Sequence, residues 1–473
     1  MGMKIVRNSK YPVFFCYKEI SEPCFYHRGH HHVGLKVISL LSNNYIADFC
    51  PNKMVMSNYE QSASIITLNV HITGDFLSLL EQWIIEKRRE FHRYPELSFN
   101  EYLTQKRIME SLREFGLESS SIAGTGVIAD IIGNGPGPCI AIRSDIDALP
   151  IQEEETVLNS EYISCHNGIM HACGHDGHMA IVLGVARLLH EKRNEFSGKV
   201  RLIFQPAEET YPGGAQKVIG NGGLKGVDAI IGLHIFGDVD AGTVRFCPGP
   251  FMASSNDFTI KLIGKGGHVS TPEYCINPIS MAADLICRAA QVVGRQVNPS
   301  KHVFGFGMLK GGTRFNIIPD EVQISGSFRT FNEKDTETID NVLEEILDSI
   351  MEEYTTEYFE CVPSYELDLS HGYPVLVNHP KFTAAAAGNL LRESFTHVEY
   401  NASPIFGSED FAYYLRHVPG MFLFLGTRNL EKSIKDINHS SSFDIDEDVL
   451  IQGVQVLSSI ALDFLKSPGD YIP

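Results

Sequence analysis

The stretch HACGHDGHMAIVLGVARLLHEK, residues 171–192, joins reactive side chains to an apolar helical pattern. Cys173 and His175 stand two positions apart, so in an extended segment both side chains would point the same way and could bind one metal ion. Apolar side chains recur at helical intervals through residues 178–192, which predicts a core-facing helix directly after this pair. A lone buried cysteine or histidine is usually structural, but the pair, with Gly174 between them, favours a metal site.

The composition is that of a folded protein with an acidic surface. The chain has 473 residues, enough for roughly two or three domains, and 43% of them are hydrophobic. Asp and Glu total 58 against 39 Lys and Arg, a formal charge of −19, which argues against a nucleic-acid partner. The ten cysteines follow no disulfide framework, and we find neither a signal peptide nor an apolar run long enough to span a bilayer. We therefore expect a cytoplasmic protein without a membrane partner.

Residues 1–70 show no sustained helical or strand period, and we assign them no function. They include a histidine run in RGHHHV, residues 28–33, which without partner ligands is more typical of an incidental surface tract than of a metal site. Met54 and Met56 stand just before the part of the chain with domain-like patterns, which raises the hypothesis that translation begins there.

From residue 75 onward the pattern is that of an α/β protein. Two helices are expected at 76–92 and 96–117, the second closed by Gly116. Four short apolar strands, each followed by glycine, proline or reactive polar residues, are expected at 138–150, 199–209, 228–236 and 421–429. Strands that alternate with helices imply a mostly parallel sheet covered on both faces, whose ligands gather beyond the carboxyl ends of the strands.

Residues 250–362 follow a different order of elements, which is the split β-α-β-β-α-β arrangement of ferredoxin-like domains. We expect an inserted second domain here. The catalytic domain would then consist of residues 71–249 and 363–473, and its second part ends in a helix at 446–467.

Acidic and imidazole side chains follow the expected strands. Glu208 and Glu209 are adjacent, so their carboxylates diverge along an extended chain, and one can bind metal while the other transfers protons. The five candidate ligands are one of these glutamates, Cys173, His175, His234 and His439. Five ligands are too many for one tetrahedral ion but suit two ions that share the thiolate. Sulfur, nitrogen and oxygen together suit zinc, while carboxylate and imidazole also allow manganese or cobalt.

Such a set predicts a hydrolytic reaction. Two divalent ions roughly 3.5–4 Å apart lower the pKa of a bridging water, and a free carboxylate can serve as base and then as acid to a departing amine. The implied reaction is hydrolysis of an amide. The competing assignment is a purely structural zinc, which predicts a closed set of ligands and leaves the second glutamate without a task.

Several motifs, in order along the chain, resemble those of a known family. They are RSDIDALP (143–150), MHACGHDGHMA (170–180), FQPAEE (204–209), GLH (232–234), GKGGHVSTP (264–272), NIIPD (316–320), GSEDF (407–411) and NHSSSFD (438–444). Through them, residues 75–470 are similar to the amidohydrolase branch of the aminoacylase and carboxypeptidase G metallopeptidase family. That branch includes hippurate hydrolases, N-acyl-amino-acid amidohydrolases and plant auxin-conjugate hydrolases. Residues 1–70 remain outside the resemblance.

The resemblance implies a role for each matching residue of the metal site. Cys173 matches the bridging thiolate and Glu208 matches the catalytic base. The remaining ligands would be His175, Glu209, His234 and His439. Three aspartates would orient the metal-bound imidazoles, namely Asp145, Asp147 and Asp176.

The resemblance also implies roles for residues that contact substrate. His268, in the inserted domain, matches a histidine that steadies the oxyanion in the partner subunit's site. Asn316 and Arg329 lie where relatives hold the substrate or its carboxylate, although Arg329 could equally be an ordinary surface charge. The segment Ser408–Asp410 could border the site or form no more than a helix N-cap box.

These features predict a two-domain α/β metallohydrolase with two divalent ions, zinc or manganese first and cobalt as a further possibility. Its substrates would be small N-acyl amino acids carrying acetyl, benzoyl or related groups. The resemblance implies a homodimer or larger homo-oligomer formed through the inserted domain. A dipeptidase or carboxypeptidase-like activity is the alternative among hydrolases. A non-catalytic binding protein on the same fold is the alternative outside them, and it would be expected to lack ligands that this sequence retains.

Overall fold

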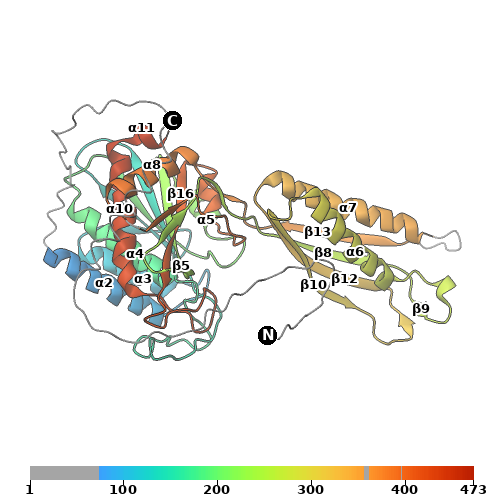
Figure 1. Cartoon of the computed structure of the whole chain (residues 1–473). Coiled ribbons are helices and arrows are strands. Elements are labelled where there is room, and N and C mark those ends of the chain that lie inside the picture. Colours follow the sequence, from blue (N-terminus) through green and yellow to red (C-terminus); the bar gives the residue numbers. More distant parts are fainter. Residues whose placement is uncertain (1–73, 356–361, 396, 473) are drawn as a thin grey trace, which may run out of the picture. The chain divides into compact units, whose positions relative to one another are not determined.

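The computed structural model describes residues 74–355, 362–395 and 397–472, and Figure 1 labels their helices and strands. The unassigned segment 1–70, with its histidine run at 28–33 and the hypothetical start at Met54 or Met56, lies outside the described residues.

The larger sheet has eight strands in the order β1-β2-β4-β3-β5-β16-β6-β15. They are β1 (Ser119–Ile122), β2 (Gly126–Ile132), β3 (Cys139–Asp145), β4 (Lys199–Gln205), β5 (Ala229–Asp240), β6 (Val244–Phe246), β15 (Val398–Tyr400) and β16 (Gly420–Arg428). The central strands β4, β3, β5 and β16 are parallel neighbours, and β3 is buried along its whole length. The mostly parallel sheet predicted from four apolar strands is confirmed, because a strand covered on both faces needs apolar residues at nearly every position.

Helices cover this sheet and bury its central strands. They are α2 (Gly74–Arg93), α3 (Tyr102–Glu114), α4 (His175–Glu191), α5 (Ala215–Gly220), α8 (Pro380–Arg392), α9 (Ala412–Leu415), α10 (Leu450–Lys466) and α11 (Pro468–Tyr471). Helices α2, α4 and α10 pack side by side against the sheet (Figure 1). A Cβ at Gly184 of α4 would stand 2.6 Å from Val454 Cγ2 and 2.9 Å from Ile84 Cγ2. Glycine at this position therefore permits the close approach of both neighbouring helices.

The second helix begins later than the sequence predicts. α3 starts at Tyr102 and not at residue 96, because the residues before it make other contacts. The Glu96 carboxylate accepts a hydrogen bond from the backbone N–H of Thr104 at 2.7 Å, and Leu97 forms a β-bridge with Ala148. These contacts place the Glu96 carboxylate at the start of α3, where it satisfies an N–H group that has no partner within the helix.

One described helix, Glu447–Lys466, is long and apolar enough to cross a membrane by length and composition alone. In this fold 61% of its most apolar window is buried inside the protein, and it packs against α4 and α8. Its apolar character is therefore that of a core helix.

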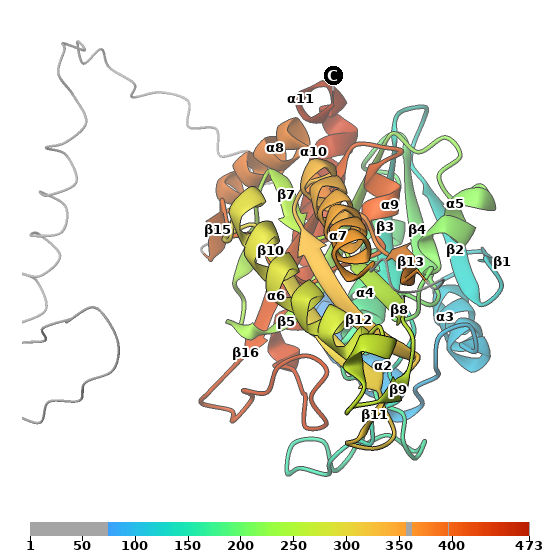
Figure 2. The same ribbon diagram turned by 90° about the vertical axis from the view of Figure 1, so that its right-hand side faces the viewer.

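Four antiparallel strands form a second sheet in the order β10-β12-β8-β13. The elements of this part are β8 (Asn256–Ile263), α6 (Pro278–Gln296), β10 (His302–Gly311), β12 (Glu321–Thr330), α7 (Glu333–Tyr354) and β13 (Ser364–His371). Their chain order is the predicted β-α-β-β-α-β, and Figure 2 shows α6 and α7 side by side on one face of the sheet. The buried residues between the helices and the sheet, such as Phe258, Leu285 and Leu343, form a separate hydrophobic cluster.

The four-stranded sheet continues past residue 362, where the sequence analysis ends the inserted domain. β13 pairs with β8 over Ser364–His371, so this last strand belongs to the second sheet. The next strand, β14 (Leu376–Asn378), pairs instead with β7 (Gly249–Met252), which precedes the second sheet in the chain. We propose that the inserted domain ends after His371 and that the catalytic domain resumes at β14.

Candidate metal and catalytic site

The predicted site residues gather at the carboxyl ends of the parallel strands. β3 ends at Asp145, and Glu208 and Glu209 follow β4. His234 lies in β5, just beyond the part of that strand that pairs with β3. His439 belongs to the loop that follows β16. Ligands of open α/β sheets are expected at this edge.

Cys173 lies in a turn and not in the extended segment that its spacing from His175 suggests. Gly174 has a φ of +88°, a left-handed conformation that glycine adopts without strain, and α4 begins at His175 rather than at residue 178. The two side chains nevertheless reach a common cluster. The ligand atoms of Cys173, His175 and His234 lie within 4.8 Å of one another.

Cys173 is common to two groups of donor atoms. Its Sγ lies 3.4 Å from His234 Nε2 and 3.2 Å from His439 Nε2. Glu209 Oε1 lies 3.4 Å from His439 Nε2 and 3.9 Å from His175 Nε2. One group therefore consists of Cys173, His175 and His234, and the other of Cys173, Glu209 and His439. Two donor groups that share a thiol could hold two ions side by side.

The chemistry of these donors fits a divalent metal. Among the described residues, the buried atoms His175 Nε2 and Glu209 Oε1 have no hydrogen-bond partner. Burial, together with the negative charges of Glu209 and Glu208, raises the pKa of the Cys173 thiol well above its ordinary value. A metal cation bound by these atoms would give His175 Nε2 and Glu209 Oε1 a partner, and it would stabilise the Cys173 thiolate.

Backbone carbonyls orient two of the imidazoles. His175 Nδ1 donates to the carbonyl of Asp147 at 2.8 Å, and His234 Nδ1 donates to the carbonyl of Ile235 at 2.6 Å. In both rings Nε2 is then left to face the cluster. The Asp147 carboxylate has a further task, because it accepts the backbone N–H groups of Glu208 and Glu209, each at 3.0 Å.

Asp176 does not orient a candidate ligand, so that prediction requires correction. Its carboxylate accepts from Arg88 Nε at 2.7 Å and from His92 Nδ1 at 2.8 Å. Successive residues of an α-helix project about 100° apart, so Asp176 points away from the cluster that its neighbour His175 faces.

A cavity of about 520 Å³ opens onto the cluster. Cys173, Glu208, Glu209, His234 and His439 line it from one side. Arg329 of β12 also lines this cavity, where its Nη1 donates to Ser408 Oγ at 2.7 Å. Burial lowers the pKa of Arg329. Arg329 is therefore a half-buried cation in the same cavity as the candidate ligands, and not an ordinary surface charge.

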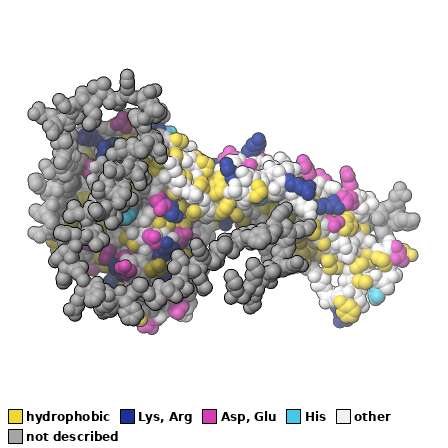
Figure 3. All heavy atoms as spheres, in the orientation of Figure 1, with side chains coloured by type: hydrophobic (Ala, Val, Ile, Leu, Met, Phe, Trp, Pro, Cys, Tyr) yellow, Lys and Arg dark blue, Asp and Glu magenta, His cyan; other side chains and the backbone are white. Residues whose placement is uncertain are grey.

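His268 and Asn316 do not line this cavity. His268 is exposed in β9 (Gly267–His268), which pairs with β11 (Ile317–Ile318), and the Asn316 carbonyl accepts from the backbone N–H of Val269. Figure 3 shows hydrophobic side chains on the surface at the end of the second sheet where Figure 1 labels β9. Within the described part of one chain, these two predicted residues stand apart from the candidate metal ligands.

Comparison with known proteins agrees with this arrangement. The model of peptidase family M20/M25/M40 matches residues 141–463. A thermostable carboxypeptidase 2 of Saccharolobus solfataricus is 39% identical over 389 residues, which cover 81% of this chain and 96% of the relative. An N-acetyl-L-cysteine deacetylase of Bacillus subtilis is 40% identical over 407 residues, which cover 85% of this chain and 93% of the relative. A crystal structure from Bacillus subtilis, described as a dinuclear metal-binding peptidase of family M20, is 35% identical with a TM-score of 0.71 and covers 82% of this chain and 99% of that one.

The chain is a member of peptidase family M20/M25/M40. The resemblance drawn from the motifs is thereby confirmed, and so is the α/β metallopeptidase fold. Membership makes this protein a hydrolase that acts on amide bonds.

In this M20 member a buried arginine links β3 to the GSEDF motif. Arg143 contacts Asp145 at 2.8 Å, Asp410 at 2.9 Å and Glu409 at 3.0 Å. The segment Ser408–Asp410 thus borders the site, and the Glu409 carboxylate also accepts from the backbone N–H of Phe411, the residue before the short helix α9, at 3.0 Å. The carboxyl groups of Glu208, Glu409 and Asp410 lie within 4.8 Å of one another. Burial first, and then the charges of Glu409 and Glu209, raise the pKa of Glu208 well above its ordinary value.

Arg143 is not among the predicted site residues, although the sequence around it carries a signal. In CIAIRSD, residues 139–145, an arginine and an aspartate stand two positions apart after four apolar residues, and alternate residues of a strand share a face. A cation and an anion on the same face of a buried strand predict an internal ion pair.

A second buried network in this M20 chain joins four separate segments. Arg88 of α2 bonds to Asp176 at 2.7 Å and to Asp444, in the loop after His439, at 2.9 Å. His92, one turn further along α2, lies between Asp176 at 2.8 Å and Glu153 at 2.9 Å. The network connects the first turn of α4 to the loop that contains His439. It therefore fixes the relative positions of two segments that supply candidate ligands.

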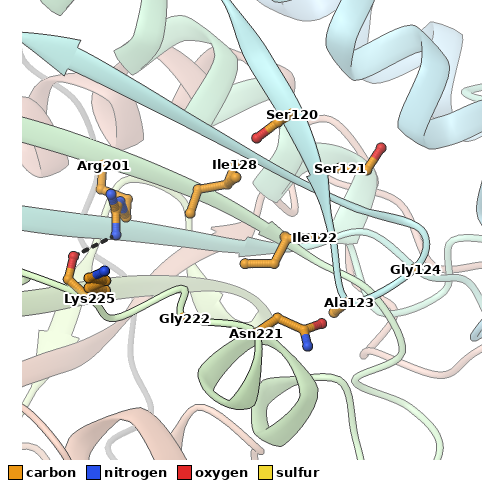
Figure 4. A pocket seen from close by; sticks show the side chains of 10 residues that line it. All are labelled: Ser120, Ser121, Ile122, Ala123, Gly124, Ile128, Arg201, Asn221, Gly222 and Lys225. Atoms are coloured by element: carbon orange, nitrogen blue, oxygen red, sulfur yellow. Dashed lines mark hydrogen bonds between the residues drawn. The ribbon is translucent and has the colours of Figure 1, made fainter.

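Another hollow of about 540 Å³ contains none of the predicted site residues. Figure 4 shows its lining at the β1–β2 edge of the sheet, with Arg201 and Lys225 among the labelled residues. Arg201 Nε donates to Asp130 at 2.8 Å, and its Nη1 donates to the carbonyls of Gly223 and Lys225 at 3.0 Å. Because its donors are already engaged, Arg201 does not make this hollow an anion site.

We predict that the stabilisation from His92 depends on pH. Burial and the charge of Arg88 lower the pKa of His92, but Asp176 and Glu153 outweigh them and raise it to about 9. Because this value exceeds the ordinary pKa of about 6.5, the contribution of charged His92 is fully present below about pH 6.5 and is lost as pH rises through the folded-state value. His92→Gln should therefore lower the free energy of unfolding by a few kcal/mol near pH 6, and by progressively less towards pH 10.

Urea unfolding of both proteins across this pH range measures the difference. His417→Gln, at an exposed histidine, is the matched control. A difference for His92→Gln that stays constant with pH would contradict the prediction.

Proposed function

We propose that this M20 member hydrolyses small N-acyl amino acids to a carboxylic acid and a free amino acid. The observation that carries the proposal is the position of Glu208, a buried carboxyl that faces the same cavity as the candidate metal donors. The carboxyl groups of Glu208 and Glu209 both lie within 4.8 Å of His175, but only Glu209 also lies in a group with Cys173 and His439, so the two glutamates are available for different tasks. The relative named N-acetyl-L-cysteine deacetylase supports an N-acyl amino acid as the substrate.

Five side chains would hold two divalent ions, with Cys173 shared between them and His175, Glu209, His234 and His439 completing the set. The solved relative described as dinuclear supports the number of ions. Zinc and manganese are our first choices and cobalt a further one, because the donors combine sulfur, nitrogen and oxygen. When bound, such ions polarise an amide carbonyl and lower the pKa of the attacking water.

Glu208 would take a proton from the attacking water and return it to the departing amine. The raised pKa of Glu208 suits the first step, because it makes the carboxylate a stronger base towards the proton of the water. Asp147 would keep the glutamate pair in place through the two backbone N–H groups that it accepts. Arg329 would bind the substrate carboxylate with its planar guanidinium group, and Asn316 would contact substrate from a second subunit.

We further propose that the enzyme is a homodimer in which His268 completes the site of the partner subunit. His268 is exposed, and large apolar side chains are exposed around it. They are Val269 at 49%, Tyr274 at 63%, Phe315 at 99% and Ile317 at 42% exposure. Apolar side chains exposed together are typical of an interaction surface.

A cytoplasmic location is part of the proposal, because a metal-binding thiol such as Cys173 must stay reduced.

A carboxypeptidase or dipeptidase activity is the second candidate. It is favoured by the thermostable carboxypeptidase 2 among the relatives. A non-catalytic role is disfavoured, since the five donors and Glu208 are all present and lie together.

The test is amine release from N-acetyl, N-benzoyl and indoleacyl amino acids and from simple dipeptides. We expect hydrolysis of at least one N-acyl class, its loss after chelation, and its recovery with zinc, manganese or cobalt. Cleavage of dipeptides with none of the N-acyl substrates would instead favour the second candidate. No hydrolysis of either class by the metal-loaded protein would count against both.

Two substitutions separate the base from the ligands. Glu208→Gln should lower kcat by at least about a thousandfold, because general-base catalysis is lost together with the return of the proton to the amine, while metal content stays unchanged. Cys173→Ala should instead lower the metal-to-protein ratio measured by elemental analysis. Glu155→Gln, at an exposed glutamate, is the control. A near-normal kcat in Glu208→Gln would show that Glu208 is not the base. An unchanged metal-to-protein ratio in Cys173→Ala would show that Cys173 is not a metal ligand.

Mixing two inactive variants tests whether His268 acts across subunits. An equal mixture of Glu208→Gln and His268→Ala chains, exchanged to form mixed dimers, should recover on the order of a quarter of the wild-type activity. Half of the dimers would be mixed, and each of these would contain one site with both residues intact. Recovery should require subunit exchange, so rapid mixing without exchange is the control. No recovery from fully exchanged dimers would place the function of His268 within its own chain or outside catalysis.

A further inference from the structure

The cavity has an apolar wall that the proposed chemistry does not use. Phe236, Met252 and Ile405 line it beside the candidate metal donors. Phe236 is two residues after His234 on β5, so both side chains lie on the same face of the strand. The Phe236 ring is held by stacking on Phe424, with ring centroids 4.4 Å apart. The wall therefore has one rigid aromatic member.

The other two members belong to paired segments. Met252 forms a β-bridge with Ile405, and the Ile405 backbone N–H donates to the carbonyl of Phe251 at 3.1 Å. A Cβ placed on Gly407 would stand 3.1 Å from Ile405 Cδ1 and 3.3 Å from Met252 Cε. Gly407 therefore leaves open the space in front of this wall. Methionine is unbranched and flexible, so Met252 can adapt to apolar groups of different shape.

The wall lies directly beside the residue proposed to bind the substrate carboxylate. Arg329 Nη1 donates to Ser408 Oγ at 2.7 Å, and Ser408 is the chain neighbour of Gly407. In an N-acyl amino acid the carboxylate and the side chain are attached to the same carbon atom. The acylated nitrogen is attached to this carbon as well, and it must bring the scissile carbonyl to the candidate metal donors. With the carboxylate on Arg329 and the amide at those donors, the side chain is the substituent left to face the wall.

We propose that Phe236, Met252, Ile405 and the space left by Gly407 form a specificity pocket for the side chain of the amino-acid half of the substrate, and that this pocket selects apolar side chains. This inference rests on the proposed function. The three wall residues carry no charge, so a charged substrate side chain would lose its hydration there without gaining a partner. The acyl group would lie outside the pocket and would be selected less strictly.

The test uses two substrate series with Gly407→Ala. One series keeps the acetyl group and varies the amino acid through alanine, methionine and phenylalanine. The other keeps alanine and varies the acyl group through acetyl, butanoyl and benzoyl. Gly407→Ala should lower kcat/KM for the methionine and phenylalanine substrates about tenfold or more relative to N-acetylalanine, mainly through KM, because the added methyl group occupies their space. The acyl series should keep its wild-type ranking.

Ile405→Val is the second variant, chosen because it preserves the fold with one methyl group fewer. It should weaken the same two substrates a few-fold relative to N-acetylalanine. Gly388→Ala, in α8 and away from the cavity, is the matched control for a glycine-to-alanine change. A change confined to the acyl series, or an equal effect of both variants on every substrate, would overturn the proposal.

A binding measurement separates this proposal from the proposed function. The metal-loaded protein should be stabilised against heat by free methionine or phenylalanine more than by alanine, and Gly407→Ala should abolish that preference. This readout needs no turnover. If the wild type hydrolyses no N-acyl amino acid yet shows the preference, the proposed function fails and the pocket stands. If it hydrolyses them without the preference, the pocket fails and the function stands.

Discussion

The burial of many acidic groups at one edge of the larger sheet is the constraint on which the rest of this structure depends. The carboxyl groups there with little or no exposure are Asp145, Asp147, Glu208, Glu409 and Asp410. Carboxylates in such proximity repel one another and lose their hydration, so each needs a cation or hydrogen-bond donors within reach. The elements around the site supply them: backbone N–H groups for Asp147, and a buried arginine for Asp145, Glu409 and Asp410.

Two buried arginines neutralise the carboxylates at the outer parts of this acidic region. The acidic groups at its centre have no arginine partner among the described residues and are left to other cations. Arg143 serves the carboxylates of β3 and the GSEDF motif, while Arg88 serves Asp176 and the loop after His439. The described residues show no ion pair between either arginine and Glu209, whose partners are imidazoles. Glu209 and the Cys173 thiol are therefore the acidic groups that a metal would neutralise. Arginines that neutralise the outer carboxylates therefore lie close to the side chains that would bind a metal.

The sequence predicted the features that have a local signal. Apolar runs predicted the central strands, and contiguous motifs predicted the five candidate metal ligands and Glu208 as the base. Contacts between distant positions left no such signal: Arg88 bonds to Asp444, 356 positions away. A small error in a local boundary also had a wider effect, because starting α4 at residue 178 instead of His175 left Asp176 in an extended segment and hid its direction. In the same way, the end of the inserted domain depended on the pairing of β13 with β8, which periodicity alone does not reveal.

The segment from Ile405 to Asp410 connects recognition with chemistry. Ile405 and Gly407 shape the apolar wall, Ser408 holds Arg329, and Glu409 lies in the carboxyl cluster with Glu208. Asp410 and Glu409 are anchored in turn by Arg143, which also contacts Asp145 at the end of β3. A displacement of this short segment would move the carboxylate-binding group, the wall and the environment of the base together. Substrate specificity and the protonation of Glu208 are therefore expected to change together when this segment is altered, whereas the metal donors, which belong to other segments, would keep their positions.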